Sequence, residues 1–385
     1  MSGKYSFAVL LCRFGDDGRG FVSINRQSVV DMFTASGVEN VVRFWHDMSF
    51  GQVDLSGSTA FPNPDAQNLG WITLAQVRSD YTGSGVNKQG RQDLVDWAKS
   101  AARGANVPVD SFDGVVVYMS TPNTDLWGGG NEVVCDSASN LTQILQEVGH
   151  GLGLGTHSRA VSSGTALDYM DPFCIMSGLT FGGVLVQNVT FQGAFGTSGP
   201  GLCAPYIAKM GWLDDHRIAG VAVPNGRTPR PTVVRLSALG DQNPANPQAA
   251  VFDLPPAKYF VEYRAGGWDR GLLQNAVVVH QYRSDQYAYY AGNIPTSTAV
   301  QPGGKTLLPG STYVDSQADL SVRVLSIQDE GATAVIQIAA VAAVQTLSVR
   351  DIARSVLQIQ GPFSVRQQVC SSGSLRNCLL ELLAR

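Results

Sequence analysis

The stretch Gln146-Glu147-Val148-Gly149-His150-Gly151-Leu152-Gly153-Leu154-Gly155-Thr156-His157 decides the fold that the sequence predicts. It is typical of the last turns of a helix that ends at glycine. Gln146 and His150 are one helical turn apart and therefore lie on one face, with Glu147 beside them. A glycine after the helix permits a left-handed backbone conformation, which would turn the chain back and bring His157 toward that face.

These side-chain types fit a metal-assisted hydrolase. A catalytic zinc ion takes three protein ligands and leaves one position for water, and a neighbouring carboxylate takes the proton of that water. We predict that Gln146, His150 and His157 are the metal ligands and that Glu147 is the general base. Zinc is the expected ion. Another divalent metal is the alternative, because an amide oxygen at Gln146 is a weaker zinc ligand than imidazole.

Two motifs carry a resemblance to a known family. Glu147-x-x-His150-x-x-Gly153, followed by His157, resembles the metzincin metalloprotease signature His-Glu-x-x-His-x-x-Gly-x-x-His. The segment from Tyr169 to Gly178 is similar to the Met-turn that lies under the metal in that clan, with Met176 as its methionine. Segments 48–55, 113–117, 205–213 and 259–270 resemble the gametolysin-like and immune-inhibitor-A-like branches. The resemblance implies a metzincin-like catalytic domain with a long active-site helix.

Two positions depart from this signature. Gln146 replaces the first His, and Thr156 stands where the third His is expected, so that His157 comes one residue late. A one-residue insertion at the glycine turn would still bring His157 round, and His157 is the preferred third ligand. Asp168 and Asp171 are the alternative carboxylate ligands.

Other residues near these motifs have two interpretations each. Tyr169 either acts on the metal or the oxyanion, as a tyrosine does in some metzincins, or packs; packing is favoured because the tyrosine of those relatives follows the methionine. The run Gly128–Gly130 precedes a predicted edge strand, to which a substrate peptide can add as a further strand, or it is a flexible loop. His46 is predicted to pack within a helix, and His216 and His280 are predicted to be structural or solvated.

The composition restricts the class of protein. Charged residues make up 15% of the 385 residues, below the roughly 25% of typical soluble domains, and the net charge is −4. We therefore expect an extracellular or secreted protein, although residues 4–13 look more like a first β-strand than a signal peptide. The sequence has no dense Lys/Arg run, so nucleic-acid binding is not predicted. No apolar run approaches the ~20 residues that a membrane-spanning helix needs.

The six cysteines show no Cys-x-x-Cys spacing, so a thiolate metal site is not expected. Cys370 and Cys378 bracket a short polar segment, which makes a local disulfide plausible. Nothing in the sequence sets the oligomeric state.

The remaining pattern predicts two domains and a tail. Buried or alternating strands are expected at 5–12, 48–57, 71–74, 114–120 and 127–134, and helices at 28–34, 38–46, 90–103, 140–153 and 205–212. From about residue 219, short β-patterned runs between turn residues predict an all-β, sandwich-like domain, with examples at 232–236, 249–254, 259–263, 276–282 and 332–338. We expect an α/β (α+β) metzincin-like domain over 1–218, with an upper subdomain 1–153 and a lower subdomain 154–218, a β-rich domain over 219–343, and a tail 344–385 without assigned structure.

Two functions are consistent with this sequence. The first is a metal-dependent endopeptidase that hydrolyses protein or peptide substrates by metal-activated water, with Glu147 as the base. The alternative is a catalytically impaired protein of the same fold that acts as a binding or adhesion module. The two departures from the signature favour the second function, and the retention of Glu147 favours the first.

Overall fold

The computed structural model describes residues 2–18, 24–64, 69–83, 87–162, 165–177, 189–223, 231–272, 274–291 and 306–341. The protein is mixed α/β, with many strands and few helices. It divides into two compact units: of the described residues, the first unit contains 2–214, 266–272 and 282–291, and the second contains 215–265, 274–281 and 306–341. The predicted tail 344–385, with its Cys370–Cys378 bridge, lies outside the described residues.

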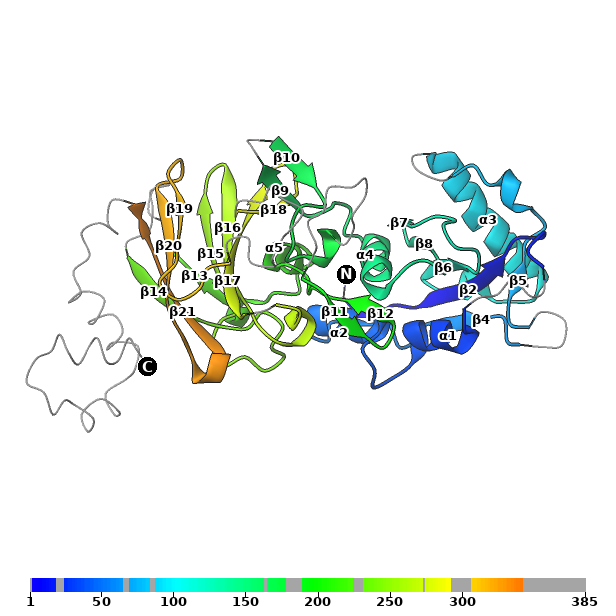
Figure 1. Ribbon diagram of the computed structural model, residues 1–385, viewed down its shortest axis with the longest axis horizontal. Coiled ribbons are helices and arrows are strands. Elements are labelled where there is room, and N and C mark those ends of the chain that lie inside the picture. The colour runs from blue at the N-terminus through cyan, green and yellow to red at the C-terminus, as the bar shows by residue number, and fades with distance from the viewer. Residues whose placement is uncertain are drawn as a thin grey trace, which may run out of the picture. The chain divides into compact units, whose positions relative to one another are not determined.

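The first unit is built on a six-stranded sheet (Figure 1). Its order is β4-β2-β6-β8-β7, and β5 also pairs with β2. All pairings are parallel except that of the edge strand β7, which is antiparallel to β8. Strands that are buried on both faces have nearly continuous apolar sequences, which is why the central strand was predictable. The strands are β2 (Phe7–Arg13), β4 (Thr59–Phe61), β5 (Ile72–Thr73), β6 (Gly114–Met119), β7 (Trp127–Gly129) and β8 (Glu132–Asp136).

Helices cover both faces of this sheet. Helix α3 (Lys88–Gly104) packs its apolar stripe on one face, where Leu94 and Ala98 join a fully buried core with Val117 of β6. Helices α1 (Arg26–Thr34), α2 (Val41–Met48) and α4 (Leu141–Gly151) lie on the other side, and Figure 1 shows α1 and α3 on opposite sides of β2. The shorter elements are β1 (Gly3–Lys4), β3 (Val53–Asp54), η1 (Arg78–Asp80), η2 (Val109–Ser111), β9 (Arg159–Ser162), β10 (Thr165–Asp168), η3 (Ile175–Ser177), β11 (Phe191–Gly193), β12 (Gly196–Ser198) and α5 (Ala204–Lys209).

Two later segments complete the first unit. In η6 (Gly267–Asp269), the Trp268 indole donates a hydrogen bond to Asp47 Oδ2 (3.0 Å) and packs edge-on against Phe44, with ring centroids 4.9 Å apart. Strand β18 (Ala288–Tyr290) pairs in parallel with β9. The sequence pattern predicted that these segments belong to the β-rich domain 219–343, because their contacts with residues far earlier in the chain leave no local pattern.

The described residues of the second unit form mainly strands. One sheet has the order β14-β21-β20-β19 and is antiparallel throughout, and a second set has the order β17-β16-β15-β13. The strands predicted at 232–236, 249–254, 259–263, 276–282 and 332–338 are confirmed. The elements are η4 (Asp215–Arg217), β13 (Ile218–Gly220), β14 (Thr232–Ser237), β15 (Ala249–Leu254), β16 (Ala257–Arg264), β17 (Ala276–Arg283), which begins in this unit, β19 (Thr312–Asp315), β20 (Leu320–Gln328), η7 (Asp329–Gly331) and β21 (Thr333–Ala340).

A charged group is buried within the second unit. Glu262 Oε1 lies 3.0 Å from Arg264 Nη1 and 3.1 Å from His280 Nδ1, and all three side chains are fully buried. Pairing of buried charges limits the cost of removing them from water. His280 is therefore a buried member of this polar group, whereas His216 lies in η4 and is exposed.

Candidate functional site

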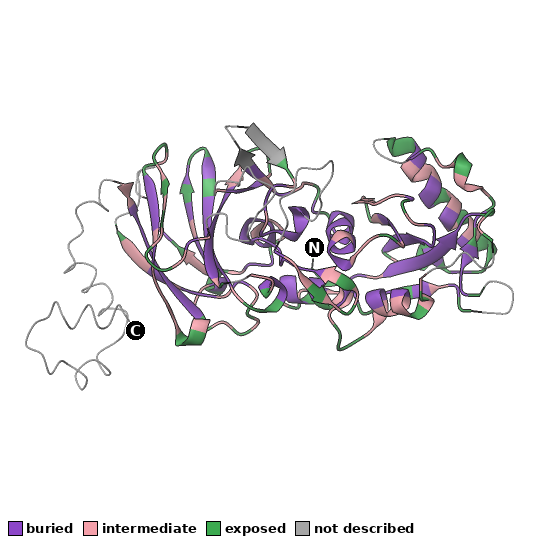
Figure 2. Cartoon of the chain, viewed as in Figure 1, coloured by how far each residue is buried: buried purple, intermediate pink, exposed green. Residues whose placement is uncertain are grey.

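Helix α4 carries the residues that the sequence analysis singled out. The Asn140 side chain accepts a hydrogen bond from the Gln143 N–H, and the Gln143 side chain accepts one from the Asn140 N–H, so a capping box begins the helix. Every residue of α4 except Gln143 is buried (Figure 2). The helix was predicted to end near Gly153. Its last residue is Gly151, and Gly153 then takes a left-handed conformation with φ of +102°.

Two buried hydrogen-bond acceptors lie one turn apart on this helix. The Nδ1 atom of His150 is 2.5 Å from the carbonyl oxygen of Leu154, which assigns the proton to Nδ1 and leaves Nε2 as an acceptor. Within the described chain, neither His150 Nε2 nor Gln146 Oε1 has a hydrogen-bond partner. Unsatisfied buried acceptors cost free energy. A metal-binding histidine typically donates its other ring N–H to a carbonyl or carboxylate, so these atoms fit a cation site.

The glycine turn brings His157 beside His150. The two ring centroids are 4.9 Å apart and the rings are nearly perpendicular, at 83°. The Tyr169 hydroxyl lies 2.9 Å from His157 Nε2, and Tyr169 has a left-handed backbone with φ of +63°. Thr156, which stands at the expected position of the third His, instead places its hydroxyl 3.0 Å from that of Tyr206.

Both histidines are neutral near pH 7. Burial lowers the pKa of His150, and it lowers the pKa of His157 to about 4, with the neighbouring His150 adding to the effect. A cation therefore need not displace protons from these rings at neutral pH.

Glu147 is a buried carboxyl group whose surroundings bring its pKa close to neutral pH. Burial raises its pKa to about 8, while the guanidinium of Arg91 and the backbone N–H of Gly128 favour the ionised form and Asp125 opposes it. The Gln146 side-chain amide also donates to Glu147 Oε1 at 3.4 Å. A group with this pKa exchanges a proton readily near neutral pH, as general acid–base catalysis requires.

Met176 packs directly against α4. A Cβ atom built on Gly149 would lie 2.6 Å from Met176 Sδ and 2.9 Å from the Trp45 ring, so only glycine fits there. The carbonyl oxygen of Met176 accepts a hydrogen bond from the Ser158 N–H (2.9 Å), next to His157. Met176 thus supports both the helix and the segment that carries His157.

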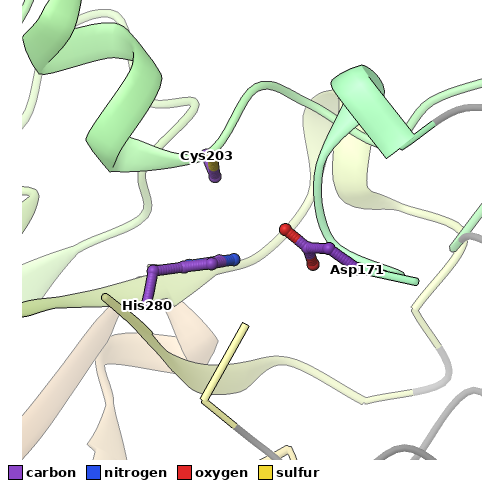
Figure 3. Close-up of side chains that lie close together, drawn as sticks. All are labelled: Asp171, Cys203 and His280. Atoms are coloured by element: carbon purple, nitrogen blue, oxygen red, sulfur yellow. The ribbon is translucent and has the colours of Figure 1, made fainter. Parts of the chain in front are cut away.

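The two alternative carboxylate ligands have other partners. Asp168 forms an ion pair with Arg159. Asp171 is fully buried and accepts hydrogen bonds from the Ser158 hydroxyl (2.6 Å) and the Phe173 N–H (2.9 Å). Figure 3 shows Asp171 together with Cys203, which also belongs to the first unit. His157 also has a partner, the Tyr169 hydroxyl, so what favours it over Asp168 and Asp171 is that its ring lies beside that of His150.

The edge strand predicted over 127–134 is a hairpin of β7 and β8. In the sheet order β7 comes last, and Gly128 lies so close to α4 that a Cβ atom would be 2.1 Å from the Glu147 carbonyl oxygen. The first two glycines of Gly128–Gly130 therefore belong to an edge strand, and Gly130 begins the turn.

The sequence pattern did not predict the hydrogen-bonded side chains that lie beside Glu147. Arg91 donates two hydrogen bonds to the carboxylate of Asp125 (2.9 and 3.0 Å), and the Tyr81 hydroxyl also donates to Asp125. Asp136, at the end of β8, accepts from the Thr124 N–H (2.7 Å). These contacts fix the loop that leads into β7. Arg91 was visible in the predicted helix 90–103, but no sequence signal joins it to Asp125.

Three histidines lie elsewhere. His46 was predicted to pack but is exposed on α2, because that helix turns Phe44 and Trp45 inward; His216 and His280 belong to the second unit. The thiols of Cys12 and Cys135 are buried, which raises their pKa and disfavours thiolate chemistry.

No protein-family model matches the chain, and no curated protein matches it. Among the described residues, no helix combines the length and apolar character needed to cross a membrane.

Proposed function

We propose that this protein is a metal-dependent endopeptidase. The observation that carries the proposal is the pair of buried acceptors on α4, Gln146 Oε1 and His150 Nε2, which have no donor in the described chain. With His157 they would hold a divalent cation, for which zinc is the first candidate. The lowered pKa values of both histidines support this role, since each ring is already neutral at pH 7.

Glu147 would move the proton in the reaction. A bound cation would supply Lewis acidity that polarises the scissile carbonyl and the attacking water. Glu147 follows Gln146 directly and is shielded from solvent, so it can accept a proton from that water and return it to the leaving amine. The opposing effects of burial and of Arg91 leave its acid and carboxylate forms close in free energy near neutral pH.

The substrate would be an extended peptide. Strand β7 is the edge of its sheet and lies against α4 at Gly128, so a peptide that adds to β7 would run past Glu147. Backbone hydrogen bonds to an edge strand are independent of side chains. This mode of binding favours protein substrates in general over one small molecule.

Elemental analysis of the purified protein, coupled to casein cleavage with and without chelator, tests the proposal. We expect one divalent ion per chain and cleavage that chelator abolishes. Glu147→Gln should keep the ion and lose cleavage, whereas His150→Ala should lose both. His46→Ala removes an exposed histidine on α2 and serves as the matched control, with metal content and cleavage unchanged.

A second function is favoured by one specific contact. His157 Nε2 already has the Tyr169 hydroxyl at 2.9 Å, and Gln146 is a weaker ligand than histidine. A protein with so weak a site would serve as a binding or adhesion module. Absence of a stoichiometric ion, together with cleavage that does not change in Glu147→Gln, would decide for this function.

A further inference from the structure

A second group of buried polar atoms lies at the carboxyl ends of β2 and β6. It consists of Arg13 Nη1, Tyr118 Oη and Ser120 Oγ, which we call the donor cluster. Each of these atoms is buried and has no hydrogen-bond partner in the described chain. All three groups can donate a hydrogen bond, and the guanidinium can only donate. The cluster therefore calls for an acceptor.

Strand pairing places the three side chains on one face of the sheet. Cys12 pairs with Met119, and beyond this pair the Ser120 N–H donates to the Cys12 carbonyl oxygen (2.9 Å), so Ser120 lies beside Arg13 on the neighbouring strand. Tyr118 is two residues before Ser120 and shares its face, because side chains alternate along a strand. Cys12 and Met119 face the other way, into the core under α3.

The charge of Arg13 is not balanced by a carboxylate. Only 6% of Arg13 is exposed, and its Nε donates to the neutral hydroxyl of Thr73 (2.9 Å). Among the described residues, no acidic side chain forms an ion pair with it. The nearest acidic groups along the chain have other partners: Asp16 accepts from the Arg78 N–H (3.0 Å), and Asp17 accepts from the Phe14 N–H (3.0 Å) and the Thr121 hydroxyl (2.5 Å). A buried, uncompensated cation is costly, and an anion would remove that cost.

The two hydroxyl groups are held in place by packing. The Tyr118 ring is fully buried between Phe33 and Trp71, with ring centroids 6.4 and 6.5 Å away. Ser120 is 1% exposed, and its carbonyl oxygen accepts from the Ser137 hydroxyl (2.8 Å). Neither side chain can reach solvent in this arrangement, so any partner must come to them.

The position of the cluster in the sheet is one where ligands bind in α/β proteins. From β2 the chain continues to β4 on one side of β2, and it later returns to β6 on the other side. Such a reversal of strand order opens a crevice outside the carboxyl ends of the strands, where ligands of open α/β sheets bind. Arg13 and Ser120 stand at that end of β2 and β6.

We propose that the donor cluster binds a small anion with several acceptor oxygens, an inorganic oxyanion or a carboxylate. This site is separate from the residues on α4, and it does not depend on the proposed peptidase activity. The guanidinium supplies charge, and the hydroxyl groups of Tyr118 and Ser120 supply two further hydrogen bonds.

Thermal unfolding of the full-length protein tests the proposal. Phosphate, sulfate, acetate and formate are titrated at constant ionic strength, with chloride as the reference. We expect a saturable rise of the unfolding midpoint for at least one of them, since a ligand of the folded state stabilises it. A rise with sulfate and phosphate but not with acetate or formate would identify an inorganic oxyanion site. A rise with acetate or formate but not with sulfate or phosphate would identify a carboxylate site.

Conservative variants keep the test independent of folding defects. Tyr118→Phe and Ser120→Ala each remove one donor and should weaken apparent binding roughly tenfold, because a hydrogen bond to a charged group contributes that much or more. Arg13→Met should abolish the shift, and Arg103→Met, at an exposed arginine paired with Asp110, should leave it intact. Two results would overturn the proposal and leave buried water as the partner. One is an unfolding midpoint that is the same in all four anions as in chloride. The other is a shift of the midpoint that is equal in wild type, Tyr118→Phe and Ser120→Ala.

Discussion

Replacement of Gly128 by alanine tests the contact between β7 and α4. A Cβ atom at this position would lie 2.1 Å from the carbonyl oxygen of Glu147, 2.9 Å from its carbonyl carbon and 3.1 Å from its Cα atom. All three are backbone atoms inside a buried helix, so no side-chain rotation can relieve the overlap. Either β7 moves away from α4 or the helix moves.

The size of the effect follows from this geometry. Overpacking of a well-packed site costs about 1–3 kcal/mol. For a unit of about 200 residues, each kcal/mol lowers the unfolding midpoint by roughly 2–4 °C, so Gly128→Ala should lower it by about 2–12 °C. Under the proposed function, peptide cleavage should also fall, because Gly128 donates its N–H to Glu147 and β7 would guide the substrate.

The neighbouring residue provides the matched control. A Cβ atom at Gly129 meets nothing within 4 Å, so Gly129→Ala should leave the midpoint nearly unchanged. Differential scanning calorimetry of both variants at one pH makes the comparison. If Gly128→Ala unfolds at the same temperature as Gly129→Ala, the close packing of β7 on α4 described above is incorrect.

Three further predictions concern α4. In metal-free protein, Glu147→Gln should raise the free energy of unfolding by a few kcal/mol at pH 8.5 and leave it unchanged at pH 4.5. The pKa of Glu147 is about 8 in the folded protein, so Glu147 destabilises the fold only at pH values where the carboxyl group of the unfolded chain is ionised, by about 1.4 kcal/mol for each unit of pKa difference. Urea unfolding at both pH values measures the difference. Asn140→Ala should cost about 1 kcal/mol through loss of the cap, and Asn140→Ser should recover most of it in the same assay. Gln146→His should raise zinc affinity in a chelator competition, and unchanged affinity would argue against a ligand role for Gln146.

Local sequence pattern was sufficient for the elements with strong periodicity or continuous burial. Helix α3 and strand β6 lie within two residues of their predicted bounds. Helix α2 was expected to begin at Val38 but begins at Val41, because the Asn40 side chain caps it by accepting from the Arg43 N–H (3.0 Å). The start of a helix is difficult to predict from sequence when its asparagine cap lies inside a short polar segment.

The sequence pattern predicted one strand over 127–134, where the structure has the hairpin of β7 and β8. Gly130 and Asn131 both have positive φ, of 57° and 73°, and form the two-residue turn between Gly129 and Glu132, which pair with each other. Two residues in this conformation are typical of the tight turns that join antiparallel strands. The sequence Gly130-Asn131 therefore contained the residues of a hairpin turn.

Helical spacing was enough to place Gln146, Glu147 and His150 together, since these positions share one short helix. It could not supply the long-range partners that set their chemistry. The ion pair between Arg91 and Asp125 joins residues 34 positions apart, and it reaches Glu147 only after the sheet has formed. The contact between Tyr169 and His157 likewise depends on the turn geometry of Tyr169.

The discontinuity of the first unit has a consequence for protein synthesis. Trp268 packs against Phe44 and Asp47, and β18 pairs with β9, so the first unit is incomplete until about residue 290 has left the ribosome. By then β14, β15 and β16 of the second unit have already been made. Expression of residues 1–214 alone would omit these closing segments of the first unit.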